Sequence, residues 1–319
     1  MRLVLPSLTG INQDLPDLFY GGWLTRMDIH IEIIAQVLFW GLYTGCIYIL
    51  LATGLNLIFG VMKIVNFAHG EFLMLGTYIT FCLFVMSGFN PYILLCASIP
   101  VLVVTGVIVE RLCFRPILGT GKLNEIFVSI GLIYVIQNLA AMIWTDEWKT
   151  IQSPFRDISL DMGSINVPLD YFIIMAVTVF LLISLYIFLY HTWTGRAVRA
   201  TSQDRSGAML MGINVERMDM ITFGIGAALA GAAGTLWAVS GQVFNPYMGS
   251  IPAIKAFAII ILGGLGSIPG AIVGGLAVGL VENGTAFTLG GAWKDAVSFI
   301  LLIIVLIIRP TGLFGEESE

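Results

Sequence analysis

The chain has few charged residues for its length. Of its 319 residues, 11% are charged and 58% are hydrophobic, and the mean hydropathy is +0.94. About a quarter of the residues in an ordinary soluble domain are charged. The formal net charge of −5 gives no basic surface for nucleic acid. This composition excludes a soluble globular domain and predicts a polytopic α-helical membrane protein.

The residues and motifs of metal and catalytic sites are also scarce. The four cysteines form no Cys-x-x-Cys pair, and the three histidines (His30, His69 and His191) are dispersed. No HExxH or GxSxG occurs, and the stretch PILGTGKL (116–123) does not meet the spacing of a phosphate-binding loop. The sequence therefore predicts no catalytic residue, metal site or cofactor. Any energy for work has to come from an ion gradient or from another subunit.

Long apolar segments are what the sequence has instead. They lie near 33–59, 66–86, 91–109, 126–145, 171–190, 221–240 and 292–309. The run 254–283 differs because a glycine-rich stretch divides it into short pieces at 254–262 and 271–281. We expect an all-α polytopic transmembrane bundle of about eight membrane segments, including this interrupted pair. A single domain would cover 31–315, between a polar N-terminal tail (1–30), which does not resemble a cleavable signal peptide, and a short C-terminal tail (316–319).

The basic loops predict the orientation. Loop 110–125 contains Arg111, Arg115 and Lys122, and segment 191–219 contains four arginines, whereas loop 146–169 has an excess of acidic residues. Cytoplasmic loops carry the excess of lysine and arginine. We therefore expect the first two segments in the cytoplasm, with the N-terminus outside and the C-terminus inside. The first apolar segment is long enough that it could be bent or broken.

The basic segment 191–219 contains signals for short helices. A helix over TSQDRSGAMLMGIN is expected to end at Gly212 in a left-handed cap, and Asn214 is expected to cap the next helix. Ala208, Met211 and Gly212 are predicted to share one face. Two hypotheses remain open from these residues: a solvated loop that follows the positive-inside bias, or a small apolar knob with basic surroundings that docks on another protein.

Polar residues inside the spans need a reason because burying them in a bilayer is costly. The motif NFAHGEF supplies Asn66, His69 and Glu71. Asn66 could be the N-cap of the second span, with Glu71 complementing the helix dipole. Alternatively, the three could line a transport pathway or its inner gate. Gln137, Asn138 and Glu282 are expected to be interhelical hydrogen-bond partners or interfacial anchors.

Glycines recur at four-residue spacing in two places. Gly226, Ala230 and Gly234 form one stripe, and Gly266, Gly270 and Gly274 form another. Such stripes let helices approach closely in lipid. Pro269 and its glycine neighbours, which include Gly263 and Gly264, are expected to break a continuous helix. Interrupted helices are typical of a transport pathway, so we expect this region to line a conduit or a moving joint.

Five blocks of the sequence, in order, support a resemblance. They are GLNLIFGVMKIVNFAHGEFLMLGTY, TGRAVRATSQDRSGAMLMGINVER, AGAAGTLWA, KAFAIIILGGLGSIPGAIVGGLAVGLVE and RPTGLFG. Over residues 36–315 the chain resembles the membrane permeases of bacterial ABC importers for branched-chain amino acids. The resemblance implies a non-enzymatic permease subunit in the inner membrane. Its implied partners are two ATP-binding subunits, a second related permease and an external substrate-binding protein, and its cargo is a small molecule.

The resemblance also implies roles for residues. The segment 195–214 takes the place of the cytoplasmic coupling helix, with Gly195, Arg196, Arg199, Ala200, Asp204, Arg205, Ala208, Gly212 and Asn214. The residue patterns described above, rather than the resemblance, assign the pathway and the packing. The pathway or gate would contain Asn66, His69, Glu71, Gly263, Gly264, Gly266 and Gly270, and helix packing would use Gly226, Ala230, Gly234 and Gly274. Motion of 195–214 would tilt the span 221–240, which would pack on 254–283.

Three alternatives remain. Permeases for urea and short-chain amides share similar blocks. A proton-driven secondary transporter could use His69 and Glu71, and it would work without partners. A membrane enzyme or structural subunit would transport nothing.

Overall fold

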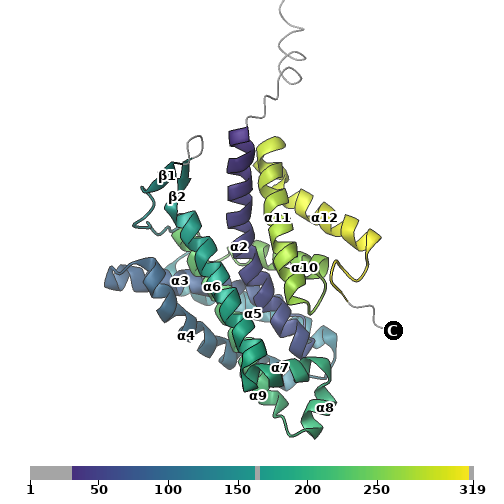
Figure 1. Ribbon diagram of the computed structural model, residues 1–319. Coiled ribbons are helices and arrows are strands. Elements are labelled where there is room, and N and C mark those ends of the chain that lie inside the picture. The colour runs from purple at the N-terminus through teal and green to yellow at the C-terminus, as the bar shows by residue number, and fades with distance from the viewer. Residues whose placement is uncertain (1–30, 162–165, 316–319) are drawn as a thin grey trace, which may run out of the picture.

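The fold is a bundle of helices (Figure 1). The structure, a computed structural model, describes residues 31–161 and 166–315, so the predicted tails 1–30 and 316–319 lie outside the described residues. Within the described part, eight helices are long and apolar enough to cross a membrane. The predicted polytopic α-helical fold is confirmed.

The first half of the chain contains five long helices and a small hairpin. The helices are α2 (Ile31–Met62), α3 (His69–Ser87), α4 (Pro91–Val109), α5 (Lys122–Trp144) and α6 (Leu169–His191). After α4 come a π-helical turn η1 (Glu110–Phe114) and a 3-10 turn η2 (Arg115–Ile117). Strands β1 (Ser159–Asp161) and β2 (Asn166–Pro168) are antiparallel, with Leu160 opposite Val167. The end of the bundle near this hairpin is called the hairpin end.

The second half contains two short helices before its spans. These are α7 (Trp193–Gln203) and α8 (Arg205–Leu210), at the opposite end of the bundle, which is called the α8 end (Figure 1). The remaining elements are α9 (Val215–Val239), α10 (Ser250–Gly263), α11 (Ile268–Thr288), the 3-10 turn η3 (Gly291–Trp293) and α12 (Lys294–Ile308).

Helix α2 occupies the centre and is continuous over 32 residues, so the long first segment is not broken. It packs most extensively on α11 and also on α9. Gly54 of α2 and Gly226 of α9 face each other, and a Cβ on either would fall within 3 Å of the other's carbonyl oxygen. Backbones this close bring many atoms into van der Waals contact, which stabilises helix pairs in lipid, where no hydrophobic force drives association.

The bundle repeats one packing pattern twice. In this pattern α2 corresponds to α9, α3 to α10 and α4 to α11. The pair α2–α11 corresponds to α9–α4, and the pair α3–α9 corresponds to α10–α2. The contact of α3 with α4 corresponds to that of α10 with α11. The contacts between Gly54 and Gly226 and between Gly70 and Gly249 are reciprocal. Counting the spans from α2 shows that α9 crosses in the opposite direction. The quartets α2–α5 and α9–α12 therefore have the arrangement of an inverted-topology repeat.

The interrupted segment differs from the expectation in its lengths. Only the first piece is short: α10 has 14 residues, whereas α11 has 21 and is long enough to span. The break covers only 264–267, and Pro269 lies in the first turn of α11. A proline there costs nothing, because the first backbone N–H groups of a helix have no intrahelical partner.

The predicted stripe of Gly266, Gly270 and Gly274 is therefore wrong. Gly266 lies in the turn with a φ of +86°, whereas Gly270 and Gly274 belong to α11. Gly270 contacts the backbone of Gly263, and Gly274 contacts Ile259, so these two glycines bring α11 against α10. A four-residue spacing makes a stripe only where the helix is continuous.

Candidate functional site

The α7–α8 segment has a cap at each helix boundary. Thr192 Oγ1 accepts from Gly195 N (2.9 Å), and Asp204 Oδ1 accepts from Ser206 N (3.0 Å). Helix α8 ends in a Schellman motif, in which Gly212 N donates to Met209 O and Ile213 N donates to Ala208 O, both at 3.0 Å. Gly212 has a φ of +81° there. The predicted left-handed cap at Gly212 is confirmed. The predicted single helix over TSQDRSGAMLMGIN is wrong, because Asp204 is extended and caps a new helix, so 201–203 belong to α7.

Asn214 then caps α9. Its Oδ1 accepts from Arg217 N at 3.0 Å, as the sequence predicts. Because both ends of the turn 211–214 are fixed by hydrogen bonds, α8 has a defined orientation relative to α9.

The apolar tip of α8 is not the predicted one. Ala208 is only 5% exposed and faces the protein, so it does not share an exposed face with Met211. The exposed side chains are Met209, Leu210 and Met211, at 55%, 88% and 84%. Met209 and Leu210 are the last two residues of α8 and Met211 is its C-cap, so the exposed residues are consecutive at the end of the helix. These three residues are called the α8 tip.

Two ion pairs connect this end of the chain to α9. Arg205 binds Asp219 through two contacts, Nη1 to Oδ1 at 3.1 Å and Nη2 to Oδ2 at 2.5 Å. The Asp219 side chain is buried in α9, and such bidentate pairs are geometrically specific. Arg115 of η2 contacts Glu216 at 3.3 Å. Helix α8 is therefore joined to α9 by the Arg205–Asp219 pair as well as by the backbone.

Sequence reasoning missed Asp219. The available signal was an acidic residue early in an apolar span, where a charge requires a partner, with an arginine in the preceding segment.

The other predicted coupling residues are distributed over α7. Gly195 is buried against Phe188 of α6, where a Cβ would clash with the backbone. Arg196 is exposed, Ala200 is half-buried, and Arg199 lies over the Tyr190 ring at 4.2 Å. Only some of the predicted set, namely Arg196, Asp204, Gly212 and Asn214, is exposed to a partner together with the α8 tip.

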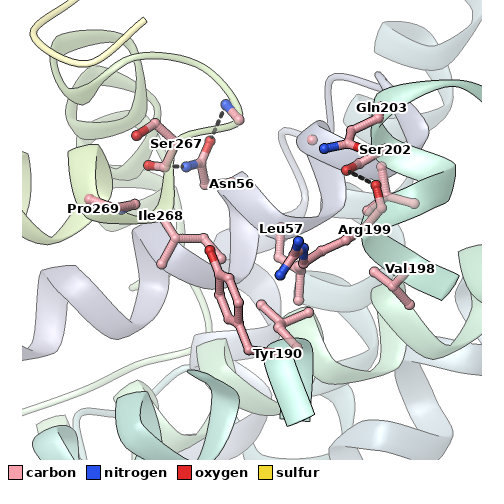
Figure 2. A pocket seen from close by; sticks show the side chains of 14 residues that line it. Asn56, Leu57, Tyr190, Val198, Arg199, Ser202, Gln203, Ser267, Ile268 and Pro269 are labelled. Atoms are coloured by element: carbon pink, nitrogen blue, oxygen red, sulfur yellow. Dashed lines mark hydrogen bonds between the residues drawn. The ribbon is translucent and has the colours of Figure 1, made fainter. Parts of the chain in front are cut away.

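A cavity of about 200 Å³ separates α7 from the α10–α11 turn (Figure 2). Helix α7 contributes Val198, Arg199, Ser202 and Gln203, the turn contributes Gly266 and Ser267, and α11 contributes Ile268 and Pro269. Asn56 of α2 holds the turn, because its Nδ2 donates to Ser267 O and its Oδ1 accepts from Gly266 N, both at 2.7 Å. Gly263, Gly264 and Gly270 are buried in backbone contacts and do not line this cavity.

Asn66, His69 and Glu71 are buried inside the bundle, with at most 1% exposure, and they do not line this cavity. Asn66 is not the N-cap of the span: α3 begins at His69 after Ala68, and Asn66 Oδ1 accepts from Ala68 N at 3.0 Å. Asn66 therefore shapes the turn that brings the chain back into the bundle. His69 Nε2 lies 3.1 Å from the carbonyl oxygen of Leu51, a residue well before the end of α2.

The first turns of α3 and α10 are in contact beside these buried residues. A Cβ on Gly70 would clash with the Gly249 backbone. Gln137 of α5 donates to Glu71 Oε1 (2.9 Å) and to Ser250 Oγ (3.0 Å), which connects the two helix starts. The positive ends of two helix dipoles thus lie near one buried carboxylate. The predicted interhelical role of Gln137 is confirmed, whereas Asn138 donates within its own helix, to Tyr134 O.

The two starts are built alike. Asn245 Oδ1 accepts from Tyr247 N (3.1 Å) as Asn66 Oδ1 accepts from Ala68 N, and a glycine follows each asparagine by four residues. Sequence reasoning missed this repeat. Its signal was the recurrence of Asn-x-x-x-Gly at 66–70 and 245–249, each before an apolar helix.

A charge cluster, in which Lys255 and Glu282 are buried and Asp295 is partly exposed, joins four helices and was also missed. Lys255 of α10 contacts Glu282 Oε1 at 2.6 Å and Asp295 Oδ1 at 2.7 Å, and it donates to Tyr48 OH at 3.0 Å. Tyr48 and Ser298 donate to Glu282 at 2.8 and 3.0 Å, which confirms its predicted interhelical role. The signal was a lysine and a glutamate of opposite charge within one apolar run.

The small residues of α9 contact other helices than expected. Gly226 contacts α2, and Gly234 contacts Leu73 and Thr77 of α3, while Ala230 is fully buried. Helix α9 makes its extensive contacts with α2, α3 and α4, so the expected direct packing of α9 on 254–283 is wrong. Helix α2 lies between α9 and the α10–α11 segment and packs on both.

The comparisons with known proteins agree with this architecture. Residues 37–306 match the model of the family described as "Branched-chain amino acid transport system / permease component". The chain belongs to this family. The resemblance drawn from the sequence blocks is thereby confirmed.

Three relatives illustrate the similarity. The chain is 36% identical to the high-affinity branched-chain amino acid transport system permease protein LivH of Salmonella typhimurium, covering 89% of this chain and 96% of the relative. It is 37% identical to BraD of Pseudomonas aeruginosa (87% and 94%) and 32% identical to a probable LivH of Methanocaldococcus jannaschii (84% and 89%). No solved structure matches the chain.

Proposed function

We propose that this protein is the membrane permease subunit of an ATP-driven importer of branched-chain amino acids. The observation that carries the proposal is similarity to LivH and BraD over nearly their whole length. These two relatives and the one from Methanocaldococcus jannaschii are all named for branched-chain amino acid transport, which favours this cargo over urea and short-chain amides.

The α8 end lies in the cytoplasm in this proposal, with the C-terminus inside and the N-terminus outside. The basic residues of 110–125 and 191–219 lie at this end and support the orientation. The α8 tip, with Arg196 and Gly212 nearby, is the docking surface for an ATP-binding subunit. Exposed methionine and leucine side chains on a short capped helix suit an apolar groove on a partner protein.

The complete importer contains two ATP-binding subunits, a second related permease and an external substrate-binding protein. The permease hydrolyses nothing itself, and ATP-driven closure of the partner subunits displaces α8. The Arg205–Asp219 pair transmits this displacement to α9, and the close contact at Gly54 and Gly226 transmits it to α2. Helix α2 holds the α10–α11 turn through Asn56, so that turn moves next.

The substrate path runs near the interface of the two quartets, where α3 and α10 begin. Inverted repeats place substrate sites near the bilayer midplane, at helix starts. Glu71 at this junction is buried and is bound by an uncharged partner, Gln137, so in this proposal it becomes accessible to the path when the two helix starts move apart. Asn66 and His69 stabilise the start of α3 through their hydrogen bonds. The moving joint is the α10–α11 turn, with Gly263, Gly264, Gly266 and Gly270.

The test is reconstitution of the chain with its partner subunits in vesicles. Uptake of leucine, isoleucine or valine should require ATP and the external binding protein, and urea should not compete. The chain alone under a proton gradient should transport nothing. Uphill transport by the chain alone would overturn the proposal in favour of a secondary transporter.

Gly212→Val tests the coupling role. A β-branched residue is strained at a φ of +81°, so transport and substrate-stimulated ATP hydrolysis should fall together while membrane insertion persists. Gly290→Val is the matched control, because Gly290 has a φ of +94° and follows α11 at the opposite end. Equal losses in both variants would contradict the assignment.

A further inference from the structure

The cavity beside Arg199 continues into an apolar groove. A second cavity, of about 170 Å³, shares Leu189, Tyr190, Ile268 and Pro269 with the first. It extends along α6 and α11, lined by Leu182, Leu185, Tyr186 and Ile272. The two together form one groove with a polar end and an apolar end, which is called the α6–α11 groove.

The polar end presents donors and one cation. Arg199, Ser202 and Gln203 line it from α7, and Ser267 lines it from the turn (Figure 2). Within the described part of the chain, Arg199 forms no ion pair with a carboxylate. Its guanidinium lies over the Tyr190 ring, so the charge is positioned but not neutralised.

The groove is long enough to hold a lipid headgroup and the first part of an acyl chain. From Tyr190, in the last turn of α6, to Leu182 the helix rises about 12 Å into the membrane span. Tyr186 and Tyr190 stack on each other at 4.5 Å, and tyrosines mark the boundary between headgroups and hydrocarbon. The polar end therefore lies at headgroup level and the apolar end lies among acyl chains.

We propose that the α6–α11 groove binds one anionic phospholipid. The phosphate of the lipid pairs with Arg199, the side-chain amide of Gln203 donates to the headgroup, and one acyl chain lies between α6 and α11. The Ser202 hydroxyl already donates to Arg199 O at 2.8 Å. A free anion would not use the apolar end. A zwitterionic lipid would bring the cationic part of its headgroup near the guanidinium, which weakens the attraction for its phosphate. The bound lipid touches both α7 and the α10–α11 turn. The leaflet follows from the orientation proposed above, but the binding site does not depend on the transport function.

The test is native mass spectrometry of the purified full-length chain with added lipids. Phosphatidylglycerol should bind about fivefold more tightly than phosphatidylcholine with the same acyl chains, the contribution of one cation near a lipid headgroup. Arg199→Gln should abolish this preference, and Arg199→Lys should retain most of it. Arg196→Gln is the matched control, because Arg196 is on the same helix but outside the groove, and it should retain the preference.

The apolar end is tested separately. Ile272→Trp fills the groove and should weaken binding of both lipids at least about tenfold, because several methylene contacts are lost. Val273→Trp, on the exposed face of α11, should not.

Three outcomes would overturn the proposal. The first is an equal loss of preference in Arg196→Gln and Arg199→Gln. The second is binding of dihexanoyl phosphatidylglycerol as tight as that of the long-chain lipid, or displacement by millimolar inorganic phosphate, since either would leave the groove unused. The third is an efficient cross-link from Ile272→Cys to a partner permease, which would identify the occupant as protein.

Discussion

The α3–α4 turn and the α10–α11 turn are built from the same kinds of residues but lie in different surroundings. Each has a glycine with positive φ after the first helix, Gly88 at +66° and Gly264 at +104°. Each then has a side-chain N-cap, Asn90 or Ser267, and a proline in the first turn of the next helix. Gly88 is exposed, and a Cβ added there would meet nothing within 4 Å, whereas Gly264 is buried against Gly315.

The second turn is braced from two sides. Asn56 binds it from α2, and the C-terminal residues Leu313 and Phe314 donate to Leu262 O and Gly263 O at 2.8 and 3.0 Å. Among the described residues, 87–90 in the first quartet make only local hydrogen bonds, such as those from Gly88 N to Phe84 O and from Tyr92 N to Asn90 Oδ1. The nearest long-range bond comes from within α4, where Tyr92 OH donates to Asp170 Oδ1 at 2.7 Å. The same local chemistry thus makes a free surface turn in one quartet and a joint connected to distant segments in the other.

The largest expected effect concerns the ionic cluster of the second quartet. Lys255→Met leaves Glu282 buried beside Asp295 without the cation, which should cost about 3–5 kcal/mol of stability. The measurement is thermal unfolding of the purified protein in detergent. Lys294→Met, at an exposed position on α12, should cost little. A triple variant with Glu282→Gln and Asp295→Asn should recover part of the loss, and no recovery would contradict a charge-based explanation.

The next effect concerns the junction of the quartets. Gly70→Val places side-chain atoms on the Gly249 backbone and should destabilise the protein by roughly 3 kcal/mol, since backbone cannot yield as a side chain can. Size-exclusion chromatography after heating would measure the surviving folded fraction. Gly131→Val, also within a helix but with open space at its Cβ, is the control. Equal losses would mean that the two quartets do not meet as closely as described.

Substitution of Gly264 should destabilise the protein more than substitution of Gly88. Gly264→Ala should cost about 2 kcal/mol, because its φ is unfavourable and Gly315 occupies the space. Gly88→Ala should cost about 1 kcal/mol, and Gly88→Asn less, since asparagine tolerates the left-handed region. Gly264→Asn should be no more stable than Gly264→Ala, because the φ of +104° and ψ of 125° at position 264 lie outside the left-handed region. Thermal unfolding of the four variants makes the comparison, and equal costs at both glycines would remove the distinction.

The smallest expected losses of stability come from removing the N-caps of α4 and α11, and they should be equal in both quartets. Ser267→Ala and Asn90→Ala each remove one N-cap, to Gly270 N at 3.2 Å and to Tyr92 N at 3.0 Å. Each should cost about 1 kcal/mol, because a cap satisfies a local backbone donor whatever surrounds the turn. If the Ser267 variant alone lost several kcal/mol in the same unfolding assay, its cap would have a role beyond the local one.

Several elements of the fold could be predicted from sequence because their causes are local. Long apolar segments predict the spans, Gly212 predicts the end of α8, and Asn214 predicts the start of α9. The lengths of α10 and α11 were predicted less well, because Pro269 was interpreted as a helix breaker. A proline in the first turn of a helix has the opposite meaning, and only the boundary at Ser267 distinguishes the two cases.

The partners of buried polar groups could not be predicted. Asp219 binds Arg205 across 14 residues, whereas Lys255 binds Glu282 and Asp295 on two other helices. The glycines of α9 predict close packing, but they do not say that α2 and α3 are the neighbours. Such pairings depend on which helix faces meet, and many arrangements of apolar helices bury similar area in lipid.

The sequence by itself determined that the chain crosses a membrane many times, where α8 ends and α9 begins, and to which family the chain belongs. Apolar length, capping residues and ordered motifs act over neighbouring residues, so they can be read without the fold. Only the tertiary structure decided that two quartets cross at bare glycines, that Asn56 holds the α10–α11 turn, and that Arg199 opens onto a groove along α6 and α11. The physical reason is that close packing in a bilayer is selected by the fit of helix surfaces, which exist only after the helices have assembled.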